Sequence, residues 1–357
     1  AYLETVAPPA LQESYDNAGL ITGNGVWNCT GIICCLDATE PVIDEAIEKK
    51  CNLVVAHHPI IFSGLKKITG KNYVERTIIK AIKNDIAIYA IHTNLDNVIE
   101  GVNGMIAQKL GLQNLSTLSH KTGQLKKLFF FVPEANAQSV MGALFDAGGG
   151  QIGNYSECSF SVPGKGTFKP NEKANPFSGE IGKREEADEI KIEVLFPAYL
   201  QNKIIVALKS SHPYEEVAYE VISIDNNHQQ IGSGITGELP EALTEAAFLE
   251  NLKSIFGLKL IKHTAFTNKP VRKVSLCGGS GSFLLKDAIN SKSDVYISSD
   301  IKYHEFFDAD NRILLVDIGH YESEQFTIEL MATLLEQKFP NFAVLKTGVN
   351  TNPVHYF

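Results

Sequence analysis

The chain has 357 residues, 44% of them hydrophobic and 20% charged, which is ordinary for a globular protein. Its formal net charge of −9 disfavours a broad nucleic-acid surface, and no apolar run approaches the roughly 18 to 20 residues that cross a bilayer. Six cysteines without any C-x-x-C spacing exclude a disulfide scaffold and argue against a thiolate zinc site.

A single hydrophobic core stops growing at about 250 to 300 residues, so a chain of this length is expected to form two domains. Its N-terminus, Ala1-Tyr-Leu-Glu-Thr5, lacks the basic start and apolar core of a signal peptide. We therefore expect a cytoplasmic protein that has no membrane partner and keeps its cysteines as free thiols.

The first third of the chain alternates short apolar runs with amphipathic segments, the pattern of an α/β unit with a parallel sheet. Strands are expected at residues 32–36, 52–56 and 86–91, and helices at about 41–47, 73–84 and 101–110. An earlier segment, Tyr15-Asp16-Asn17-Ala-Gly19, is interpreted first as turn chemistry.

Each of these strands runs into polar side chains. The first ends at Asp37, the second at His57-His58-Pro59, and the third at His92-Thr-Asn-Leu-Asp96. Because open α/β sheets carry their sites at the carboxyl ends of the strands, we expect these side chains to converge. A lone histidine there could equally be a hydrogen-bonded core or loop residue, but an adjacent pair favours metal binding.

The pattern changes from about residue 125. Strands are expected at 127–132, 190–196 and 218–224 and helices at 134–147 and 199–210, whereas 151–189 is rich in Gly, Ser, Asn and Lys and includes the turn-prone Pro163-Gly-Lys-Gly166. We interpret a β-α-β-β-α-β order as a ferredoxin-like α+β module of about 100 residues, inserted between two halves of the larger domain. His212, just before the last of these strands, is interpreted as a structural turn residue.

The α/β pattern then resumes. Helices are expected at 248–256 and 283–289, and strands at 271–276, 295–297 and 313–318. Gly278-Gly-Ser-Gly281 lacks the spacing of a P-loop, so it is only a weak indication of phosphate binding and is equally compatible with close strand–helix packing. His320 and Glu324 are four residues apart and share a face if a helix begins at Gly319.

Five residues make a metal-competent set without a thiolate: His57, His58, Asp96, His320 and Glu324. Three imidazoles and two carboxylates suit zinc, iron or manganese rather than calcium. The set is also large enough for two ions that share a bridging group.

The motifs around these residues resemble the Nif-three-like dinuclear-metal family, whose bacterial members are often labelled type 2 GTP cyclohydrolase I. The resemblance covers most of the chain, with the motifs in the same order. They are Tyr15-Asp-Asn-Ala-Gly-Leu20, Leu36-Asp-Ala-Thr39, Val55-Ala-His-His-Pro59, His92-Thr-Asn-Leu-Asp96, Gly319-His-Tyr-x-x-Glu324 and Val349-Asn-Thr-Asn-Pro-Val354.

The resemblance implies a Nif-three-like mixed α/β domain in two sequence halves, 1–124 and 232–357, around a PII/CutA-like insertion at 125–231. It also implies a toroidal homohexamer of two stacked trimers. Each subunit would hold two divalent ions, zinc first and iron or manganese as alternatives. The ligands would be the residues matching His57, His58, Asp96, His320 and Glu324.

Further residues match polar positions that line the family's site, and we expect them to orient ligands or move protons. They are His92, Asp37, Asp16, Asp300 and His304. One departure is Ser298-Ser299-Asp300, where the family pattern has Thr-Gly-Asp.

Two hypotheses for the function follow. In the first, the protein is a metal-dependent hydrolase of the GTP cyclohydrolase type, which attacks a ring carbon of a small, nucleotide-like substrate through a metal-bridging water while Asp37, His92 or His304 assists. In the second, it is a metal-binding hexameric scaffold or regulatory protein without turnover. Nucleic-acid binding is disfavoured by the acidic balance.

Overall fold

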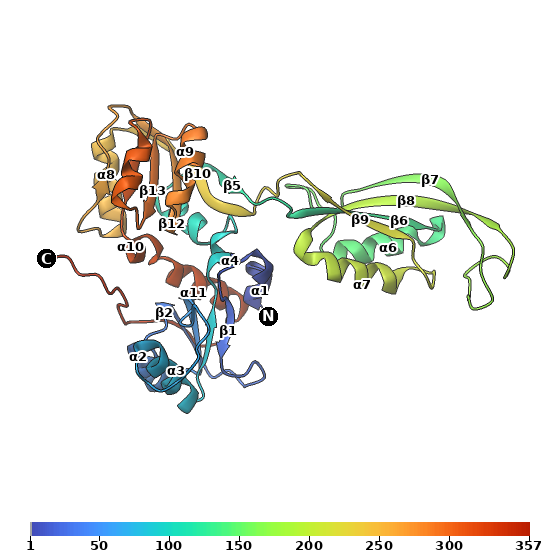
Figure 1. Cartoon of the computed structure of the whole chain (residues 1–357), viewed down its shortest axis with the longest axis horizontal. Coiled ribbons are helices and arrows are strands. Elements are labelled where there is room, and N and C mark those ends of the chain that lie inside the picture. Colours follow the sequence, from blue (N-terminus) through green and yellow to red (C-terminus); the bar gives the residue numbers. More distant parts are fainter. Residues whose placement is uncertain (1) are drawn as a thin grey trace. The chain divides into compact units, whose positions relative to one another are not determined.

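Three β-sheets organise the chain in the computed structural model, which describes residues 2–357 (Figure 1). Two of the sheets belong to one unit, formed by the residues up to Ser119 together with Gln230–Phe357. The third belongs to a second unit, His120–Gln229. The first unit is thus assembled from two separate stretches of sequence, and the second unit interrupts it.

A five-stranded sheet has the order β1-β4-β3-β2-β15, so β3 is its central strand. The strands are β1 (Gly19–Thr22), β2 (Ile32–Asp37), β3 (Leu53–His58), β4 (Ala87–Ala90) and β15 (Val344–Lys346). All run parallel except β1 at the edge. The apolar run of β3 is buried on both faces, as parallel strands require, and the strand extends through both histidines rather than ending at Ala56.

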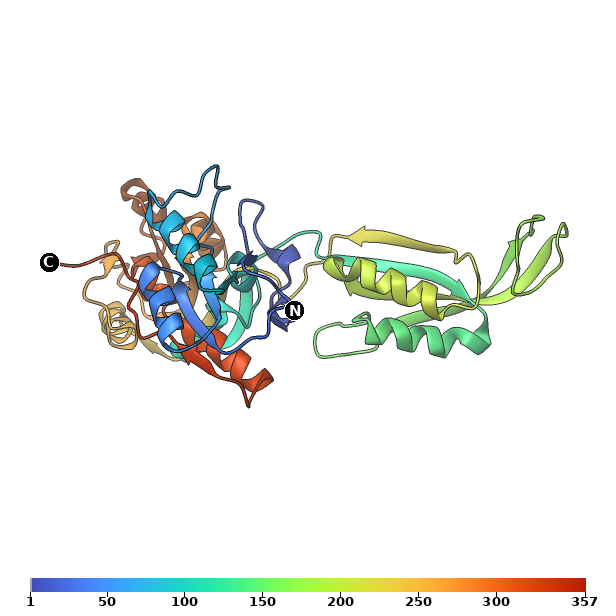
Figure 2. The same ribbon diagram turned by 90° about the horizontal axis from the view of Figure 1, so that it is seen from below.

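Helices cover both faces of this sheet. On one face lie α2 (Glu40–Glu48) and α3 (Tyr73–Lys83), which Figures 1 and 2 show beside each other in blue. On the other face a larger core joins this sheet to α5 (Val102–Lys109), α11 (Thr327–Lys338) and the six-stranded sheet. The short elements α1 (Tyr2–Val6), η1 (Pro9–Leu11) and α4 (Thr93–Asp96) complete this region.

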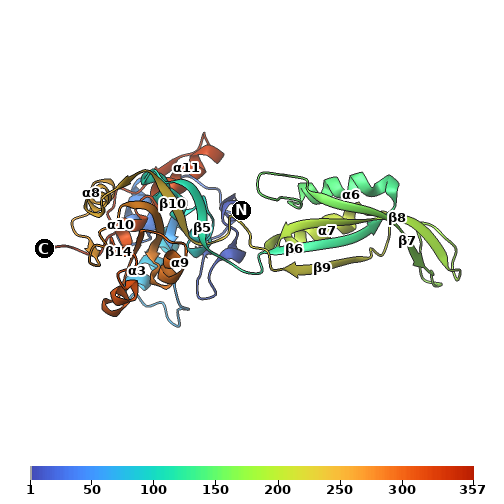
Figure 3. The same cartoon turned by 90° about the horizontal axis from the view of Figure 1, so that it is seen from above.

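The six-stranded sheet has the order β11-β14-β13-β12-β10-β5, and β5 and β10 are seen together in Figure 3. Its strands are β5 (Gln113–His120), β10 (Gly232–Leu243), β11 (Lys262–His263), β12 (Val271–Ser280), β13 (Val295–Ser299) and β14 (Leu314–Asp317). The three central strands β12, β13 and β14 are parallel. Helix α8 (Glu245–Phe256) packs in the core shared with the other sheet, whereas η3 (Ser282–Leu284), α9 (Leu285–Asn290) and η4 (Tyr303–Ala309) pack in a separate cluster.

The second unit is a four-stranded antiparallel sheet in the order β7-β8-β6-β9, with both helices on one face (Figure 1). Its elements are β6 (Leu125–Val132), α6 (Glu134–Asp146), β7 (Ser159–Phe168), β8 (Glu185–Pro197), η2 (Ala198–Leu200), α7 (Gln201–Ser211) and β9 (Tyr219–Ile224). This β-α-β-β-α-β order and sheet topology confirm the ferredoxin-like prediction. His212 accepts a bond from the Tyr214 amide and contacts the Phe131 carbonyl, in keeping with a structural role.

One prediction in this unit is wrong. Pro163-Gly-Lys-Gly166, expected as a turn, lies inside β7, where Pro163 pairs with Ile190 of β8. The sheet order explains why: β7 is an edge strand, the position in a sheet where proline is tolerated, because one side of the strand has no partner that needs its N–H groups. No helix among residues 2–357 is long and apolar enough to span a membrane.

Candidate metal centre

The polar strand ends of the first unit converge, as the sequence pattern predicted. In the register of the five-stranded sheet Asp37 lies opposite His58, and the rings of His57 and His92 are 5.3 Å apart. Helix α10 (His320–Glu324), which follows β14 of the six-stranded sheet, brings His320 to this point, with 5.2 Å between its ring and that of His58. The site therefore lies between the two sheets of one unit.

Local sequence explains how α10 presents its side chains. Gly319 precedes the helix with φ = 90°, a backbone conformation that residues other than glycine rarely adopt. The helix then begins at His320, and the spacing of four residues places His320 and Glu324 on one face, with 3.1 Å between Nε2 and Oε2. The predicted i, i+4 pair is present.

Three of the candidate ligands form a tight triangle. Nε2 of His58 lies 3.4 Å from Nε2 of His320, and Oε2 of Glu324 lies 3.0 Å from the former and 3.1 Å from the latter. Two nitrogens bound to one tetrahedral zinc at about 2.0–2.1 Å lie about 3.3–3.4 Å apart. The donor atoms of this triangle are therefore spaced like ligands of a single ion.

A second group of acceptors lies on the other side of Glu324. Nε2 of His57 is 3.6 Å from Oδ1 of Asp96 and 3.8 Å from Oε1 of Glu324. His57 is fully buried, and its Nδ1 bonds the Ile91 carbonyl oxygen at 2.8 Å, which makes Nδ1 the protonated nitrogen. Its Nε2 thus presents a lone pair to Asp96, and an ionised carboxylate there offers only lone pairs in return.

These atoms have no hydrogen-bond partner among the described residues. Nε2 of His57 and Oδ1 of Asp96 are both buried and unsatisfied. An unpaired buried polar atom costs about 1–3 kcal/mol, and while Asp96 is ionised the two facing acceptors have no donor to share between them. A cation between them removes this cost, so the residues fit a metal ion.

Burial and nearby charges shift the pKa values of His57, Asp96 and Glu324 in different directions. Burial lowers the pKa of His57, which keeps its imidazole neutral. Burial, together with the charge of Glu324, raises the pKa of Asp96 well above its ordinary value. For Glu324 burial acts in the same direction, but hydrogen bonds from His320 and His58 outweigh it and hold the pKa well below the usual range. Glu324 thus carries a negative charge at the centre.

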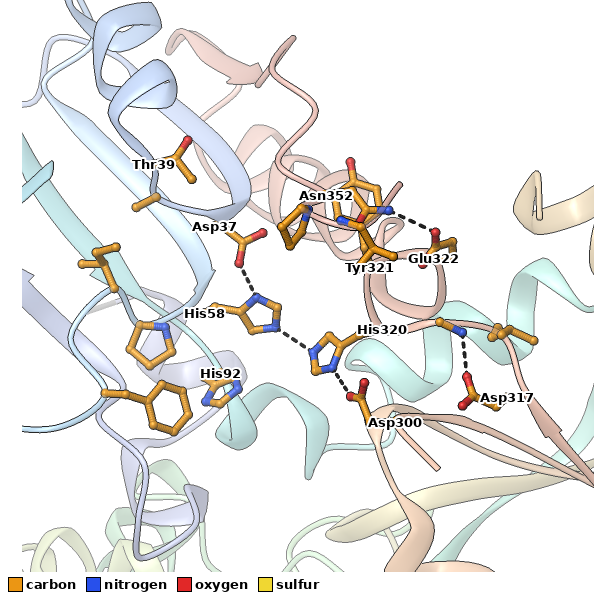
Figure 4. Close-up of a pocket in the computed structure, with 18 of the residues that line it drawn as sticks. Asp37, Thr39, His58, His92, Asp300, Asp317, His320, Tyr321, Glu322 and Asn352 are labelled. Carbon is orange, nitrogen blue, oxygen red and sulfur yellow. Dashed lines mark hydrogen bonds and ion pairs between the residues drawn. The ribbon is translucent and has the colours of Figure 1, made fainter. Parts of the chain in front are cut away.

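A second layer of carboxylates orients the imidazoles. Nδ1 of His58 bonds Asp37 at 2.8 Å, and Nδ1 of His320 bonds Asp300 at 2.5 Å (Figure 4). For both histidines burial acts to lower the pKa, but the bonds to these acids and to Glu324 outweigh it, raising the pKa of His58 to about 9 and of His320 to about 11. A carboxylate on the far ring nitrogen is the usual partner of a metal-binding histidine.

His92 has the same arrangement. Its Nδ1 bonds Oδ1 of Asp16 at 2.8 Å, and Asp16 also accepts bonds from the amide and hydroxyl of Thr93. Asp16, first interpreted as a turn residue, therefore fixes a ring at the centre. Ligand atoms of His57, His58 and His92 lie within 4.8 Å of one another, as do those of His58, His320 and Glu324. No cysteine belongs to either group of described residues.

His304 lies elsewhere. It is exposed on η4, where its ring contacts those of Tyr303 and Phe307. It does not line either of the two cavities that reach the centre, whereas His92 and His320 line both. The structure therefore brings Asp37 and His92 to the centre, but not His304.

Gly279 makes room for Glu324, a role that the sequence left open between phosphate binding and close packing. A Cβ atom at Gly279 would lie 2.3 Å from Oε1 of Glu324 and 3.4 Å from the His320 ring. Gly279 also has φ = 63°. The neighbouring Ser298, where the family pattern has threonine, donates a hydrogen bond to the Gly279 carbonyl oxygen at 3.0 Å. These contacts are those of close strand–helix packing.

The larger cavity beside the centre has a volume of about 730 Å³, within the range of small-molecule sites. Its lining includes four aromatic side chains, Phe62, Tyr73, Tyr321 and Tyr356, and four carboxylates, Asp37, Asp300, Asp317 and Glu322. Among its lining residues Lys262 is the only lysine or arginine, and its Nζ already pairs with Oδ2 of Asp317 at 2.5 Å.

Comparison with known proteins agrees with this architecture. The model of the family described as Duf34/NIF3 (NGG1p interacting factor 3) matches residues 1–353. A protein of Halalkalibacterium halodurans described as "GTP cyclohydrolase 1 type 2 homolog" is 38% identical over 355 residues, which cover 98% of this chain and 95% of that protein. A Bacillus subtilis protein with the same description is 38% identical over 356 residues, with the same coverage.

Solved structures give the same result. The crystal structure of a Bacillus cereus protein related to NIF3 superposes with a TM-score of 0.87 and 37% identity, covering 100% of this chain and 97% of that one. A Staphylococcus aureus protein superposes with a TM-score of 0.78 and 29% identity, with the same coverage. The similarity therefore extends over both units of the chain.

Proposed function

Since this chain belongs to the Duf34/NIF3 family, we propose that it is a dinuclear metal-binding protein that acts as a metal-dependent hydrolase. The relatives named "GTP cyclohydrolase 1 type 2 homolog" make GTP the first substrate to test. The single observation that carries the metal claim is the pair of buried, unpartnered acceptors, His57 Nε2 and Asp96 Oδ1, which face each other at 3.6 Å.

The donor atoms support two positions that share Glu324. Oε2 of Glu324 faces His58 and His320, whereas Oε1 faces His57 on the side of Asp96. We propose that His58 and His320 would hold one divalent ion and His57 and Asp96 the other, with Glu324 offering one oxygen to each group. Zinc suits this set of nitrogen and oxygen donors, with iron and manganese as alternatives. When bound, two such ions supply Lewis-acid activation of water and of a substrate atom.

The lining of the cavity favours binding of a substrate through a heterocyclic ring rather than through phosphate groups. Its aromatic side chains offer faces for stacking, whereas its carboxylates repel phosphate groups and its one lysine is already paired. We therefore propose that the ring of the substrate enters the cavity, as the cyclohydrolase reaction requires, and that any phosphates stay toward solvent.

His92 is the proposed proton carrier. Asp16 bonds its Nδ1 and so leaves Nε2 as the exchangeable position at the centre. Asp37, by contrast, bonds His58 and is proposed to hold that imidazole rather than to move protons.

Turnover of GTP tests the proposal. Hydrolytic removal of the guanine carbon between the imidazole nitrogens releases that carbon as formate, which a coupled assay measures. We expect zinc-loaded protein to release formate, and Asp96→Asn to reduce the release to background because its amide is a poor metal ligand. If the zinc-loaded wild type releases no formate, the cyclohydrolase assignment is wrong.

Light scattering on the same samples separates catalysis from scaffolding. We propose a toroidal homohexamer, so both proteins are expected at about six times the chain mass of 39.1 kDa. An Asp96→Asn protein that loses its assembly while the wild type shows no turnover would favour the alternative, a metal-dependent scaffold.

A further inference from the structure

The C-terminal segment begins beside the five-stranded sheet. After β15 the Thr347 amide donates to the Cys34 carbonyl oxygen at 2.9 Å, and the Gly348 amide donates to Oε1 of Glu45 at 3.0 Å. Beyond this anchor the chain has no regular secondary structure up to Phe357. It nevertheless lines the 730 Å³ cavity with Asn352, Pro353, Val354 and Tyr356.

Two consecutive residues of this segment form hydrogen bonds on opposite sides of the metal centre, one to β2 and one to α10. Thr351 donates from Oγ1 to Oδ2 of Asp37 at 2.8 Å. Asn352 donates from Nδ2 to Oε1 of Glu322 at 3.0 Å, and Glu322 lies on α10 (Figure 4). The segment is thus bonded both to the acid that bonds His58 and to the helix that carries His320.

The bond from Thr351 restrains the orientation of Asp37. One oxygen of this carboxylate, Oδ1, bonds Nδ1 of His58 at 2.8 Å, and the other is occupied by Thr351. The Asp37 side chain is 35% exposed, so without the hydroxyl, water competes for Oδ2 and the carboxylate can rotate. Rotation would release Nδ1 of His58, whose Nε2 is one corner of the donor triangle.

We propose that Thr351 is a positioning residue of the metal centre, acting on His58 through Asp37. The inference rests on the proposed metal centre and goes beyond it, because it adds the C-terminal segment to the site. Thr351 touches neither the candidate ligands nor the reacting groups, so its effect is on affinity and ligand geometry. Residues that hydrogen-bond to metal ligands, as Asp37 does to His58, typically contribute 10–100-fold to metal affinity.

Zinc affinity tests the proposal, measured by competition with a chromophoric chelator on the full chain. We expect Thr351→Val, which keeps the shape and removes the hydroxyl, to bind zinc about tenfold more weakly. Thr351→Ser restores the hydroxyl and is expected to bind like the wild type. The matched control is Thr267→Val, which removes a threonine–carboxylate bond of 2.9 Å to Glu245 away from the centre.

Two further readouts exclude a purely structural effect. The visible spectrum of the cobalt-loaded protein is expected to change in Thr351→Val only, and the unfolding midpoint of the metal-free protein is expected to stay unchanged. Wild-type affinity in Thr351→Val, or an equal loss in Thr267→Val, would overturn the role of Thr351 alone. A wild type that binds neither zinc nor cobalt would overturn the metal centre itself, and the inference with it.

Discussion

Replacing Gly279 by alanine is expected to weaken zinc binding at the Glu324 position strongly. The new Cβ would lie 2.3 Å from Oε1 of Glu324, a separation that forces the carboxylate or the backbone to move. Since Glu324 faces His57, His58 and His320, its displacement disturbs both proposed ion positions. We expect zinc affinity to fall by about 100-fold, the upper end of the effect that residues supporting metal ligands have, measured by chelator competition.

A control separates this steric effect from backbone strain. Gly257 has φ = 64°, nearly the same as Gly279, but a Cβ there meets nothing within 4 Å. Both alanine variants are expected to lose about 1–2 kcal/mol of stability from the left-handed conformation. Only Gly279→Ala should lose metal, and wild-type zinc affinity in that variant would contradict the packing of Gly279 against Glu324.

Replacing His92 by alanine is expected to lower kcat by about 10²–10⁴-fold, the usual contribution of a positioned acid–base group. The metal content should remain, because the two proposed ion positions use other residues. The measurement is formate release together with elemental analysis of the same preparation. Loss of metal together with turnover would instead make His92 a ligand, consistent with its closeness to His57 and His58.

His304→Ala is the matched control. This histidine was predicted beside His92 as a proton carrier, but it is exposed and its ring contacts are with Tyr303 and Phe307. We expect kcat to be unchanged in this variant. A loss equal to that of His92→Ala would reverse the assignment and give His304 the proton-transfer role.

The strand ends could be predicted from the sequence because they depend on local signals. An apolar run that stops at a histidine pair and a proline indicates a buried parallel strand, and β3 is indeed central in its sheet. Spacing alone predicted that His320 and Glu324 share a helical face. These signals lie within a few residues of one another, so no knowledge of the tertiary fold is needed.

Other parts of the site depend on tertiary contacts that local patterns do not encode. Thr351 and Asp37 are 314 residues apart in the chain, and Asp16 and His92 are 76 apart. Gly279 is one of 28 glycines, and only the position of Glu324 reveals why it must lack a side chain. A family resemblance could point to Asp16, but its hydrogen-bond partner comes from the fold.

Strands that lie outside the alternating pattern were also missed. β5 and β10 were not expected, although they extend the six-stranded sheet. The exposed residues at the start of β5 give it no buried face to detect. In β7 the glycines and the proline resemble a turn, and only the edge position in the sheet makes a strand possible.

The most direct test of the central claim is the metal content per chain, measured by elemental analysis of untagged protein beside Asp96→Ala and His320→Ala. We expect about two divalent ions per chain in the wild type and a clear loss in both variants. Circular dichroism of each sample checks that the variants fold. Absent or sub-stoichiometric metal in the wild type, unchanged by either substitution, would contradict the dinuclear centre.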